Sequence, residues 1–324
     1  MRGLVGFGAN LLLSHADGKR GAEALCSLEF HVQTDLYLTP TAAYADIVLP
    51  IASGWEREGL RVGFALDQSA CEYVQLRPAI VPERGEARAD IDVVFDLAVR
   101  LGLGDRFWQG DVESGLAHHL APSGLTPTML RSAPRSTLRV PLETRYRKYQ
   151  QQGFSTPFGK LEIFSTALQA IGQSPLPEFR APHLDPTAKF PLVLTSAKTP
   201  IYCHSQHRNL ARLRRIIPDP VVEINPVTAE LHEIEQDEWV SISTPRGSVR
   251  ARAHLNASLA DGVIGGQHGW WQSCPDLGLP GYDPLGSDGA NINLVIGDEV
   301  LDPISGAAPH RCYPAQLRRF ANST

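Results

Sequence analysis

Short apolar runs alternate with helix-like stretches through the first hundred residues of the chain. The apolar runs occupy 3–7, 30–34 and 47–49, and the stretches 21–28 and 39–45 lie between them. Such alternation is typical of βαβ units, in which helices join the parallel strands of one sheet. The first strand runs straight into a glycine turn, which normally lies inside an α/β domain. We therefore expect a partial α/β domain with a parallel, Rossmann-like sheet.

A helix is predicted over residues 89–101. Its apolar residues follow the i, i+3, i+4, i+7 spacing of one helix face and end before Gly102: Ile91, Val94, Phe95, Ala98 and Leu101. Between about 104 and 189 the chain becomes rich in proline, glycine, serine and charged residues. We interpret this stretch as a long, ordered connector.

Strand-like segments dominate from Phe190 onward. They lie at 192–195, 221–224, 239–244, 248–255 and 263–265. Within 248–255 apolar and polar residues alternate, which is the pattern of a half-buried antiparallel strand. The last part of the chain is therefore predicted to be mostly a β-barrel. The expected divisions are 1–110 for the partial α/β domain, 111–189 for the connector and 190–324 for the barrel.

The composition excludes two classes of protein. The 324 residues are 43% hydrophobic and 20% charged, with a formal net charge of −5. No uncharged apolar run is long enough to span a bilayer, and the amino terminus has no signal-peptide pattern. Arginine and lysine form no basic stripe. We expect neither a transmembrane segment nor a nucleic-acid partner.

The cysteines are odd in number, widely spaced and never in a C-x-x-C pair: Cys26, Cys71, Cys203, Cys274 and Cys312. This usage favours reduced thiols in a cytoplasm. Iron–sulfur and structural zinc sites need several thiolates brought together by close spacing. Neither kind of site is predicted in this chain.

Polar residues follow the first two predicted strands. Gly8-Ala9-Asn10 follows the first, and Thr34-Asp35 ends the second. Because ligands of open parallel sheets bind beyond the carboxyl ends of the strands, Asp35 is placed to accept hydrogen bonds from a guanine edge and Asn10 can offer an amide. The alternatives are an ordinary glycine turn and a helix cap at Asp35.

Histidine and tryptophan residues in the second half have two interpretations. Cys203, His204 and His207 lie close in sequence, but two histidines and one thiol beside a turn are more often hydrogen-bonded residues than metal ligands, so we predict no metal site. Trp270 and Trp271 are either core aromatics or stacking platforms for a ligand.

Two polar groups are equally ambiguous. Asn291 and Asn293 either contact a ligand or shape a loop. The arginine group formed by Arg208, Arg212, Arg214 and Arg215 is either a solvated face or a contact for pyrophosphate.

Several segments together resemble one enzyme family. The run from Thr34-Asp35 through Ala45-Asp46-Ile47-Val48-Leu49-Pro50 to Glu56-x-Glu58-Gly59 resembles a signature of the molybdopterin guanine dinucleotide oxidoreductases, the family of dimethyl sulfoxide reductase, formate dehydrogenase and periplasmic nitrate reductase. The resemblance continues at 85–90, 154–162, 194–198, 203–208, 291–293 and 302–306. It covers nearly the whole chain.

This resemblance implies a set of cofactor contacts. The guanosine end of one dinucleotide would be bound by Asn10, Thr34, Asp35, Arg57 and Asp90. The position of Arg57 is often lysine in the family, and arginine keeps the positive charge. A six-stranded, double-psi-type barrel, the molybdopterin dinucleotide-binding domain, would close over the other dinucleotide and the pterins with Thr195, Ala197, His204, Ser205, Asn293 and Arg311. Trp270 or Trp271 would stack near a pterin or the substrate funnel.

The resemblance also implies a function. The chain would be the carboxy-terminal part of an oxidoreductase, and would bind and orient bis-molybdopterin guanine dinucleotide with molybdenum or tungsten. In the family the amino-terminal half supplies the metal-ligating residue and any iron–sulfur cysteines. None of those motifs is present in this sequence, so no catalytic residue is predicted and the chain alone is expected to be inactive.

The expected partners follow from the same resemblance. They are the missing amino-terminal half, on the same or a separate chain, and an iron–sulfur electron-transfer subunit. Two alternatives stay open: part of a hydratase similar to acetylene hydratase, and a non-catalytic nucleotide- or protein-binding module.

Overall fold

The computed structural model describes residues 1–63, 65–176, 178–179 and 185–320. The chain forms two compact units. Unit 1 combines Met1–Pro50 with Pro182–Thr324, and unit 2 is Ile51–Ala181. The first and last parts of the chain therefore fold together, and unit 2 is inserted between them in sequence.

A parallel three-stranded sheet forms the α/β part of unit 1. Its order is β1-β2-β3, with β1 at Gly3–Phe7, β2 at Phe30–Asp35 and β3 at Ile47–Pro50. Helix α1 (Gly18–Cys26) joins the first two strands, and the side chain of Asp17 caps it by accepting a hydrogen bond from the backbone N–H of Arg20. The predicted parallel sheet is confirmed.

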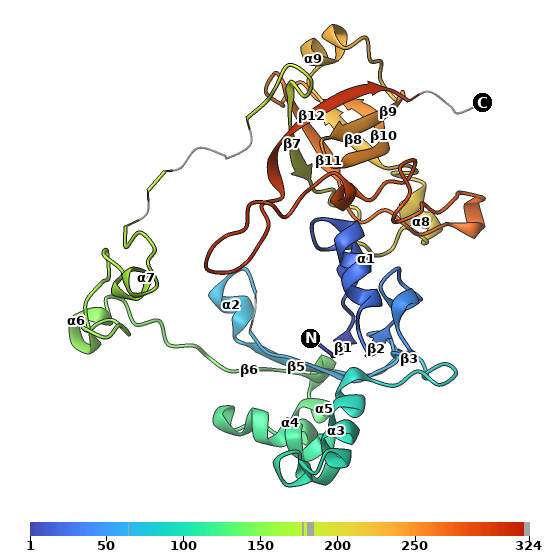
Figure 1. Cartoon of the computed structure of the whole chain (residues 1–324). Coiled ribbons are helices and arrows are strands. Elements are labelled where there is room, and N and C mark those ends of the chain that lie inside the picture. Colours follow the sequence, from blue (N-terminus) through green and yellow to red (C-terminus); the bar gives the residue numbers. More distant parts are fainter. Residues whose placement is uncertain (64, 177, 180–184, 321–324) are drawn as a thin grey trace. The chain divides into compact units, whose positions relative to one another are not determined.

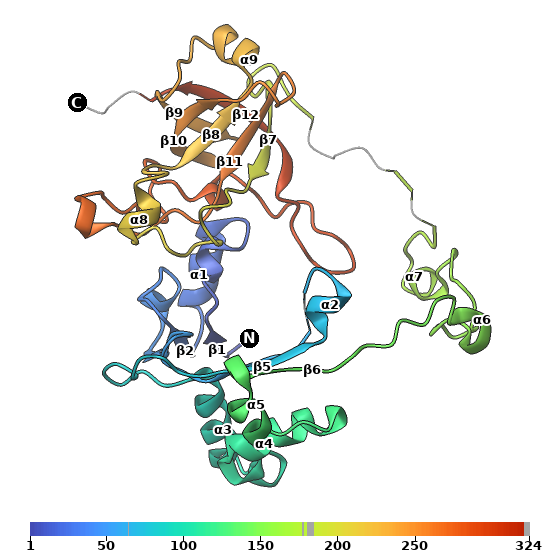
Figure 2. The same ribbon diagram turned by 180° about the vertical axis from the view of Figure 1, so that it is seen from behind.

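The rest of unit 1 is a closed β-barrel of the order β10-β8-β11-β7-β12-β9 (Figure 1). Its strands are β7 (Leu192–Ala197), β8 (Val221–Ile224), β9 (Trp239–Thr244), β10 (Gly247–Leu255), β11 (Val263–Gln267) and β12 (Arg311–Arg319). Two neighbouring pairs, β10 with β8 and β11 with β7, are parallel. Seen from behind, β8 and β11 lie between β10 and β7 (Figure 2). The short helices α8 (Ala211–Arg214) and α9 (Pro226–Leu231) belong to the connections of the barrel.

Apolar residues that alternate along the strands fill the barrel. On β10, Val249, Ala251 and Ala253 are buried, whereas Arg250 and Arg252 between them are partly exposed. This confirms the predicted half-buried strand, although β10 is antiparallel only to β9. The alternation arises because successive side chains of a strand point to opposite faces.

The α/β part and the barrel are joined within unit 1 by hydrogen bonds and ion pairs. The N–H of Asp17 donates to the carbonyl of Ile296 over 2.8 Å, and the side-chain amide of Asn291 donates to the carbonyl of Leu12 over 3.3 Å. Arg246, in the turn between β9 and β10, lies 2.9 Å from the Asp17 carboxylate. The two parts therefore share backbone and side-chain contacts.

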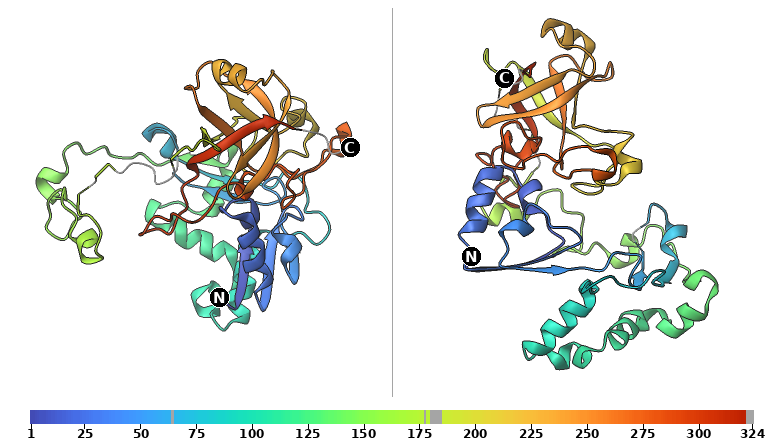
Figure 3. Two further views of the ribbon diagram at one scale, coloured as in Figure 1. Left: turned by 45° about the horizontal axis from the view of Figure 1, so that its top comes forward. Right: turned by 90° about the vertical axis from the view of Figure 1, so that its right-hand side faces the viewer.

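Unit 2 contains an antiparallel sheet and several helices (Figure 3). The sheet order is β4-β5-β6, from Gly59–Arg61, Tyr73–Arg77 and Thr137–Arg139. The helices are α2 (Gln68–Cys71), α3 (Asp90–Arg100), α4 (Val112–Leu120), α5 (Pro127–Ser132), α6 (Tyr149–Gln152) and α7 (Thr166–Ala170). Helix α3 confirms the helix predicted over 89–101.

The range 111–189 holds more than turns. Leu120 of α4 and Leu130 of α5 are buried with Val74 and Leu76 of β5, so these helices complete a small hydrophobic core. The five cysteines are free thiols. None of the helices in the described ranges is both long and apolar enough to cross a membrane.

Candidate cofactor site

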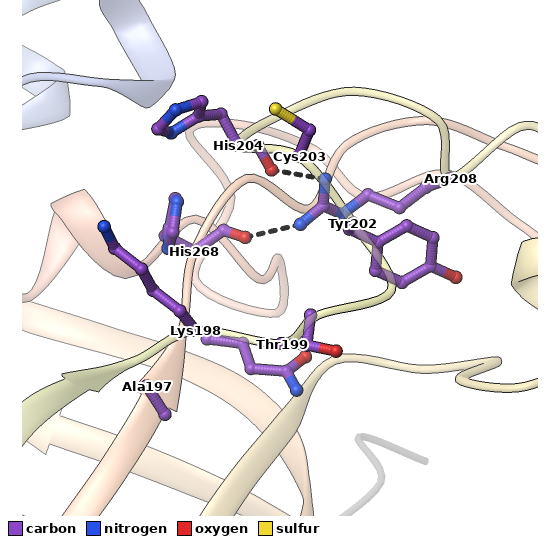
Figure 4. Close-up of a pocket in the computed structure, with 9 residues that line it drawn as sticks. Ala197, Lys198, Thr199, Tyr202, Cys203, His204, Arg208 and His268 are labelled. Atoms are coloured by element: carbon purple, nitrogen blue, oxygen red, sulfur yellow. Dashed lines mark hydrogen bonds between the residues drawn. The ribbon is translucent and has the colours of Figure 1, made fainter. Parts of the chain in front are cut away.

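A pocket lies where β7 and β11 end. These strands are parallel neighbours, and their last residues, Ala197 and Gln267, are partners in the register. Because parallel strands present their carboxyl ends at one edge, the segments that follow them meet there. The cavity has a volume of about 180 Å³ and is lined by Ala197, Lys198, Thr199, Tyr202, Cys203, His204, Arg208, Gln267 and His268 (Figure 4).

The pocket is lined by basic and neutral side chains. Lys198, His204, Arg208 and His268 contribute to its wall, and none of the nine lining residues is acidic. Concave surfaces of one charge sign in a low-dielectric wall concentrate ions of the opposite sign. The arrangement suits an anionic group.

His268 is held in its neutral form. Burial, together with the positive charge of Arg208 and the neighbouring His204, Lys198 and His310, lowers its pKa to about 4. The rings of His204 and His268 lie 6.1 Å apart. The His268 imidazole can therefore act as a neutral hydrogen-bonding group at physiological pH.

Arg208 is 1% exposed, and its guanidinium donates to backbone carbonyls. Its guanidinium donates to the carbonyls of His204, of Gln206 at 3.0 Å and of His268 at 2.8 Å. Figure 4 shows the bonds to His204 and His268, which bridge the segments after β7 and β11. Burial lowers the pKa of Arg208 to about 10, which leaves it charged at neutral pH.

A second arginine lies in the same aromatic cluster. Arg214 is fully buried and donates to the carbonyls of Pro218, Arg208, Gln272 and Pro280. The guanidinium carbons of Arg208 and Arg214 lie 5.2 and 4.9 Å from the ring centre of Trp270. A solvated face is therefore the wrong interpretation for Arg208 and Arg214, because aromatic rings and carbonyls replace water around them; Arg212 and Arg215 are exposed.

Trp270 itself is a core residue. It is fully buried, makes edge-to-face contacts with Tyr202 and Tyr282, and donates its indole N–H to Gln267 over 3.1 Å. It does not line the pocket. Of the two interpretations of Trp270, a core aromatic and a stacking platform, the structure shows the core aromatic. Trp271 is partly buried and donates its indole N–H to the carbonyl of Ser205.

The turn beside the pocket has an unusual backbone. His204 and His207 have φ angles of 48° and 72°, in the left-handed region that non-glycine residues seldom adopt. Opposite them, Gly269 has a φ of 82°, and a Cβ at that position would lie 2.5 Å from the carbonyl oxygen of His204. Only glycine permits this approach of the two segments.

Asn10 and Ser205, both predicted from sequence, are brought together. The side-chain amide of Asn10 donates to the Ser205 hydroxyl over 3.2 Å, and its carbonyl oxygen accepts from Thr41 over 3.0 Å. Two other predicted residues, Ala197 and His204, lie in the pocket wall.

Other predicted residues lie elsewhere in unit 1. Thr195 on β7 is the register partner of Arg311 on β12. Thr34 is fully buried at the end of β2, and its hydroxyl has no hydrogen-bond partner among the described residues. Asp35 accepts a hydrogen bond from the N–H of Leu36 and does not cap a helix. Asn293 is buried in the short 3-10 helix Ile292–Leu294.

Arg57 and Asp90 belong to unit 2. There the Arg57 guanidinium lies 3.9 Å from the Asp90 carboxylate, and both side chains are about one-third exposed. Asn291 has a structural role, because it caps the 3-10 helix and bonds the carbonyls of Leu12 and Pro284.

The pocket residues that sequence reasoning missed are Gln267 and His268, whereas Lys198 and Arg208 lie in segments of the family resemblance. Gln267 and His268 lie about sixty positions beyond those segments, so no local spacing joins them to the pocket. The parallel pairing of β7 and β11 brings them there. Within the part of the chain that the structure describes, no three His, Cys, Asp or Glu side chains are grouped to hold a metal ion.

Comparisons with known proteins agree with this arrangement. The family model described as "Molybdopterin oxidoreductase" matches residues 3–100, and that described as "Molydopterin dinucleotide binding domain" matches residues 192–313. The second match ends within β12 and contains the whole pocket.

Named relatives align along most of the chain. They include a dopamine dehydroxylase of Eggerthella lenta (28% identity, 94% of this chain and 37% of that protein) and an acetylene hydratase of Syntrophotalea acetylenica (26%, 92% and 41%). The assimilatory nitrate reductase catalytic subunit of Bacillus subtilis is 29% identical over 94% of this chain and 40% of its own length. The chain thus spans about two-fifths of these relatives.

A solved structure shares the fold. Acetylene hydratase from Pelobacter acetylenicus matches with a TM-score of 0.83 and 23% identity, over 98% of this chain and 44% of that one. This likeness shows the fold, and the two family models, at residues 3–100 and 192–313, together with the named relatives support the molybdopterin oxidoreductase family for this chain.

Proposed function

We propose that the chain is the carboxy-terminal part of a molybdenum or tungsten oxidoreductase and that it binds and orients bis-molybdopterin guanine dinucleotide. The observation that carries this proposal is the pocket at the ends of β7 and β11, which has basic and no acidic lining residues. All of its lining residues lie within the range that matches the dinucleotide-binding domain. One family model is described as a molybdopterin oxidoreductase and the other as a molydopterin dinucleotide-binding domain, and this combination disfavours the non-catalytic module.

The pocket suits part of such a cofactor. Its volume of about 180 Å³ accommodates a phosphate-sized anionic group rather than a whole dinucleotide. Lys198 would supply a mobile charge, and His204 and His268 would supply hydrogen bonds. When bound, the cofactor supplies the redox-active metal, and the residues of this chain hold and orient its organic part.

The other contacts are proposed from the family resemblance. Asn10, Thr34, Asp35, Arg57 and Asp90 would bind one guanosine, and Thr195, Ala197, Ser205, Asn293, Arg311 and Trp270 would contribute to the second dinucleotide and the pterins. The Asn10–Ser205 hydrogen bond supports a shared site for Asn10 and the barrel. The complete burial of Trp270 makes it the weakest member, because its ring faces are already occupied by core contacts.

Finer features of the fold belong to the same proposal. The six closed strands with two parallel pairs support a double-psi-type barrel. The sequence domains 1–110, 111–189 and 190–324 remain predictions; the compact units follow spatial contacts instead. We further propose a cytoplasmic location and two partners: a polypeptide that supplies the cysteine-bearing half, and an iron–sulfur electron-transfer subunit.

The test is cofactor retention. The chain is purified alone and after co-expression with the cysteine-bearing half, and molybdenum, tungsten and acid-released GMP are measured. We expect metal and GMP in the complex. Lys198→Gln should lower the retained GMP several-fold, whereas Lys19→Gln, which removes an exposed charge on α1, should not. A complex without metal and GMP would refute the proposal, and GMP bound by the chain alone would favour a nucleotide-binding module.

A further inference from the structure

Arg208 connects two segments that carry the histidines of the pocket. One segment, 203–208, follows β7 and contains His204. The other, 267–269, ends β11 and contains His268. A single guanidinium donates to carbonyls in both.

We propose that Arg208 is a positioning residue of the pocket: its guanidinium fixes the 203–208 turn against the 267–269 segment, and it places an unneutralised positive charge beside His268. The inference depends on the proposed function only for the nature of the ligand, because the positioning itself is a property of the ligand-free chain.

The geometry requires a planar, multivalent donor. Nη1 donates to the carbonyls of His204 and Gln206 and Nη2 donates to the carbonyl of His268, and a guanidinium presents these N–H groups in a rigid fork. A lysine ammonium has the same charge but no fork. The Tyr202 ring, 4.6 Å from the guanidinium carbon, and the Trp270 ring fix the plane of the fork.

The turn needs such a restraint. Left-handed φ angles at His204 and His207 are unfavourable for residues with a Cβ, so the surrounding structure must compensate for them. The guanidinium contacts the carbonyl of His204, and Gly269 packs against the same carbonyl from the other segment. Both contacts hold His204 in the conformation that puts it on the pocket wall.

The hydrogen-bond partners of Arg208 leave its positive charge unneutralised. None of the ion pairs among the described residues involves Arg208, whose hydrogen bonds go to neutral carbonyls. A carboxylate would neutralise the guanidinium, whereas carbonyl dipoles stabilise it and leave its field in place. This field contributes to the low pKa of His268.

Arg214 is a matched control within the same cluster. It is equally buried and lies against the same tryptophan, but its carbonyl partners are those of Pro218, Arg208, Gln272 and Pro280, and it does not line the pocket. Loss of Arg214 therefore removes a buried arginine while leaving in place the bonds to the carbonyls of His204, Gln206 and His268.

The first measurement is amide hydrogen exchange of the full ligand-free chain. Arg208→Met and Arg208→Lys should both accelerate exchange in 203–208 and 267–269, by about tenfold if one or two net hydrogen bonds are lost. Arg214→Met should instead accelerate it near 218 and 280. Wild-type exchange in Arg208→Lys, or the same pattern in Arg214→Met, would overturn the positioning role. Arg208→Lys keeps the test valid if Arg208→Met does not fold.

The second measurement is the titration of His268 by NMR. Arg208→Met should raise its pKa from about 4 toward the ordinary 6.5, and Arg214→Met should leave it in place. An unchanged pKa in Arg208→Met would mean that Arg208 only fills the core. Neither readout uses a cofactor, so failure here is distinguishable from failure to retain GMP.

Discussion

The side-chain amide of Asn10 donates a 3.2 Å hydrogen bond to the hydroxyl of Ser205, a residue 195 positions further along the chain. The same asparagine accepts from the Thr41 hydroxyl, whose oxygen accepts in turn from the N–H of Leu12. A short polar chain thus links the turn after β1 to the barrel. Because Asn10 is 7% exposed, an unpaired amide there would be costly.

This bond predicts an energetic coupling between the two residues. In a double-mutant cycle with Asn10→Ala and Ser205→Ala, the coupling free energy of unfolding should be about 1 kcal/mol. Urea denaturation of the four proteins measures it. Asn10→Ala combined with Ser241→Ala, which changes a hydroxyl bonded to Ser243 instead, should be additive. A coupling near zero for the first pair would mean that the bond contributes nothing.

A single methyl group added at Gly269 should lower the stability of the protein strongly. Both Gly269 and Gly262 have left-handed φ angles, but a Cβ at Gly262 meets no heavy atom within 4 Å, whereas one at Gly269 meets the His204 carbonyl. Gly262→Ala should cost about 1 kcal/mol of stability from its backbone conformation. Gly269→Ala should cost at least about 2 kcal/mol more because backbone must move. Equal melting temperatures for the two variants would contradict this.

Arg246 predicts a pH-dependent contribution to stability. It contacts the carboxylates of Asp17, Asp298 and Glu299, and its hydrogen bond lowers the pKa of Glu299. A carboxyl whose pKa is lower in the folded state stabilises the fold above its unfolded pKa and loses that contribution as the pH falls through the folded value. Arg246→Gln should therefore cost about 1 kcal/mol at pH 7 and progressively less below about pH 4.

Chemical denaturation measures the stability difference between the wild type and Arg246→Gln. A range from about pH 3 to about pH 8 spans the carboxyl titration. The matched control is Arg2→Gln, because the Arg2–Glu29 pair is isolated and largely exposed. Its removal should change stability little at any pH. A cost for Arg246→Gln that does not depend on pH would assign its role to packing.

His268 predicts a loss of stability in the same direction, but at higher pH. Its folded pKa of about 4 lies below the ordinary 6.5, so between these values the unfolded chain binds a proton that the folded chain does not. Stability should fall as the pH falls through this interval. His268→Gln should lose less stability over the same interval, whereas His119→Gln, an exposed control in unit 2, should behave as the wild type. Identical slopes for His268→Gln and wild type would show that His268 is not held neutral.

An anion bound in the pocket should raise the lowered pKa of His268. A phosphate group beside His268 would favour its charged form, so binding should take up a proton near pH 5.5, between the two pKa values. Calorimetry with inorganic pyrophosphate in two buffers of different ionisation enthalpy measures the uptake. His268→Gln should bind without it. Pyrophosphate binding with no proton uptake in the wild type would place the anion away from His268.

The regular elements were predictable because their side chains follow simple periods. The strands β1 to β3, β7 to β11 and helix α3 all have runs or alternations of apolar residues. Strand β12 was not identified from periodicity: Pro314 lies within it and the register shifts beside Cys312, whose φ is 65°. Bulges and prolines interrupt the alternation on which strand prediction depends.

The site was only partly predictable. Asn10, Ala197, His204 and Ser205 were found through a family pattern in the sequence. Arg208 and His268 depend on two parallel strand ends meeting, and strand order within a barrel is not encoded in local spacing. The burial of Arg208 and Arg214 was also hidden, because their carbonyl partners are backbone groups that every residue possesses.

The discontinuity of unit 1 has a consequence for biosynthesis. During translation residues 1–50 are made before unit 2, but their barrel partners follow only after all of unit 2 has been made. The segment containing Asn10 must wait for Ser205 and Asn291, while unit 2 can bury its own leucine core in the meantime. Long-range pairing of this kind slows folding and exposes intermediates to misassembly. We therefore expect the nascent β1-β2-β3 sheet to remain without its barrel contacts until unit 2 has been synthesised.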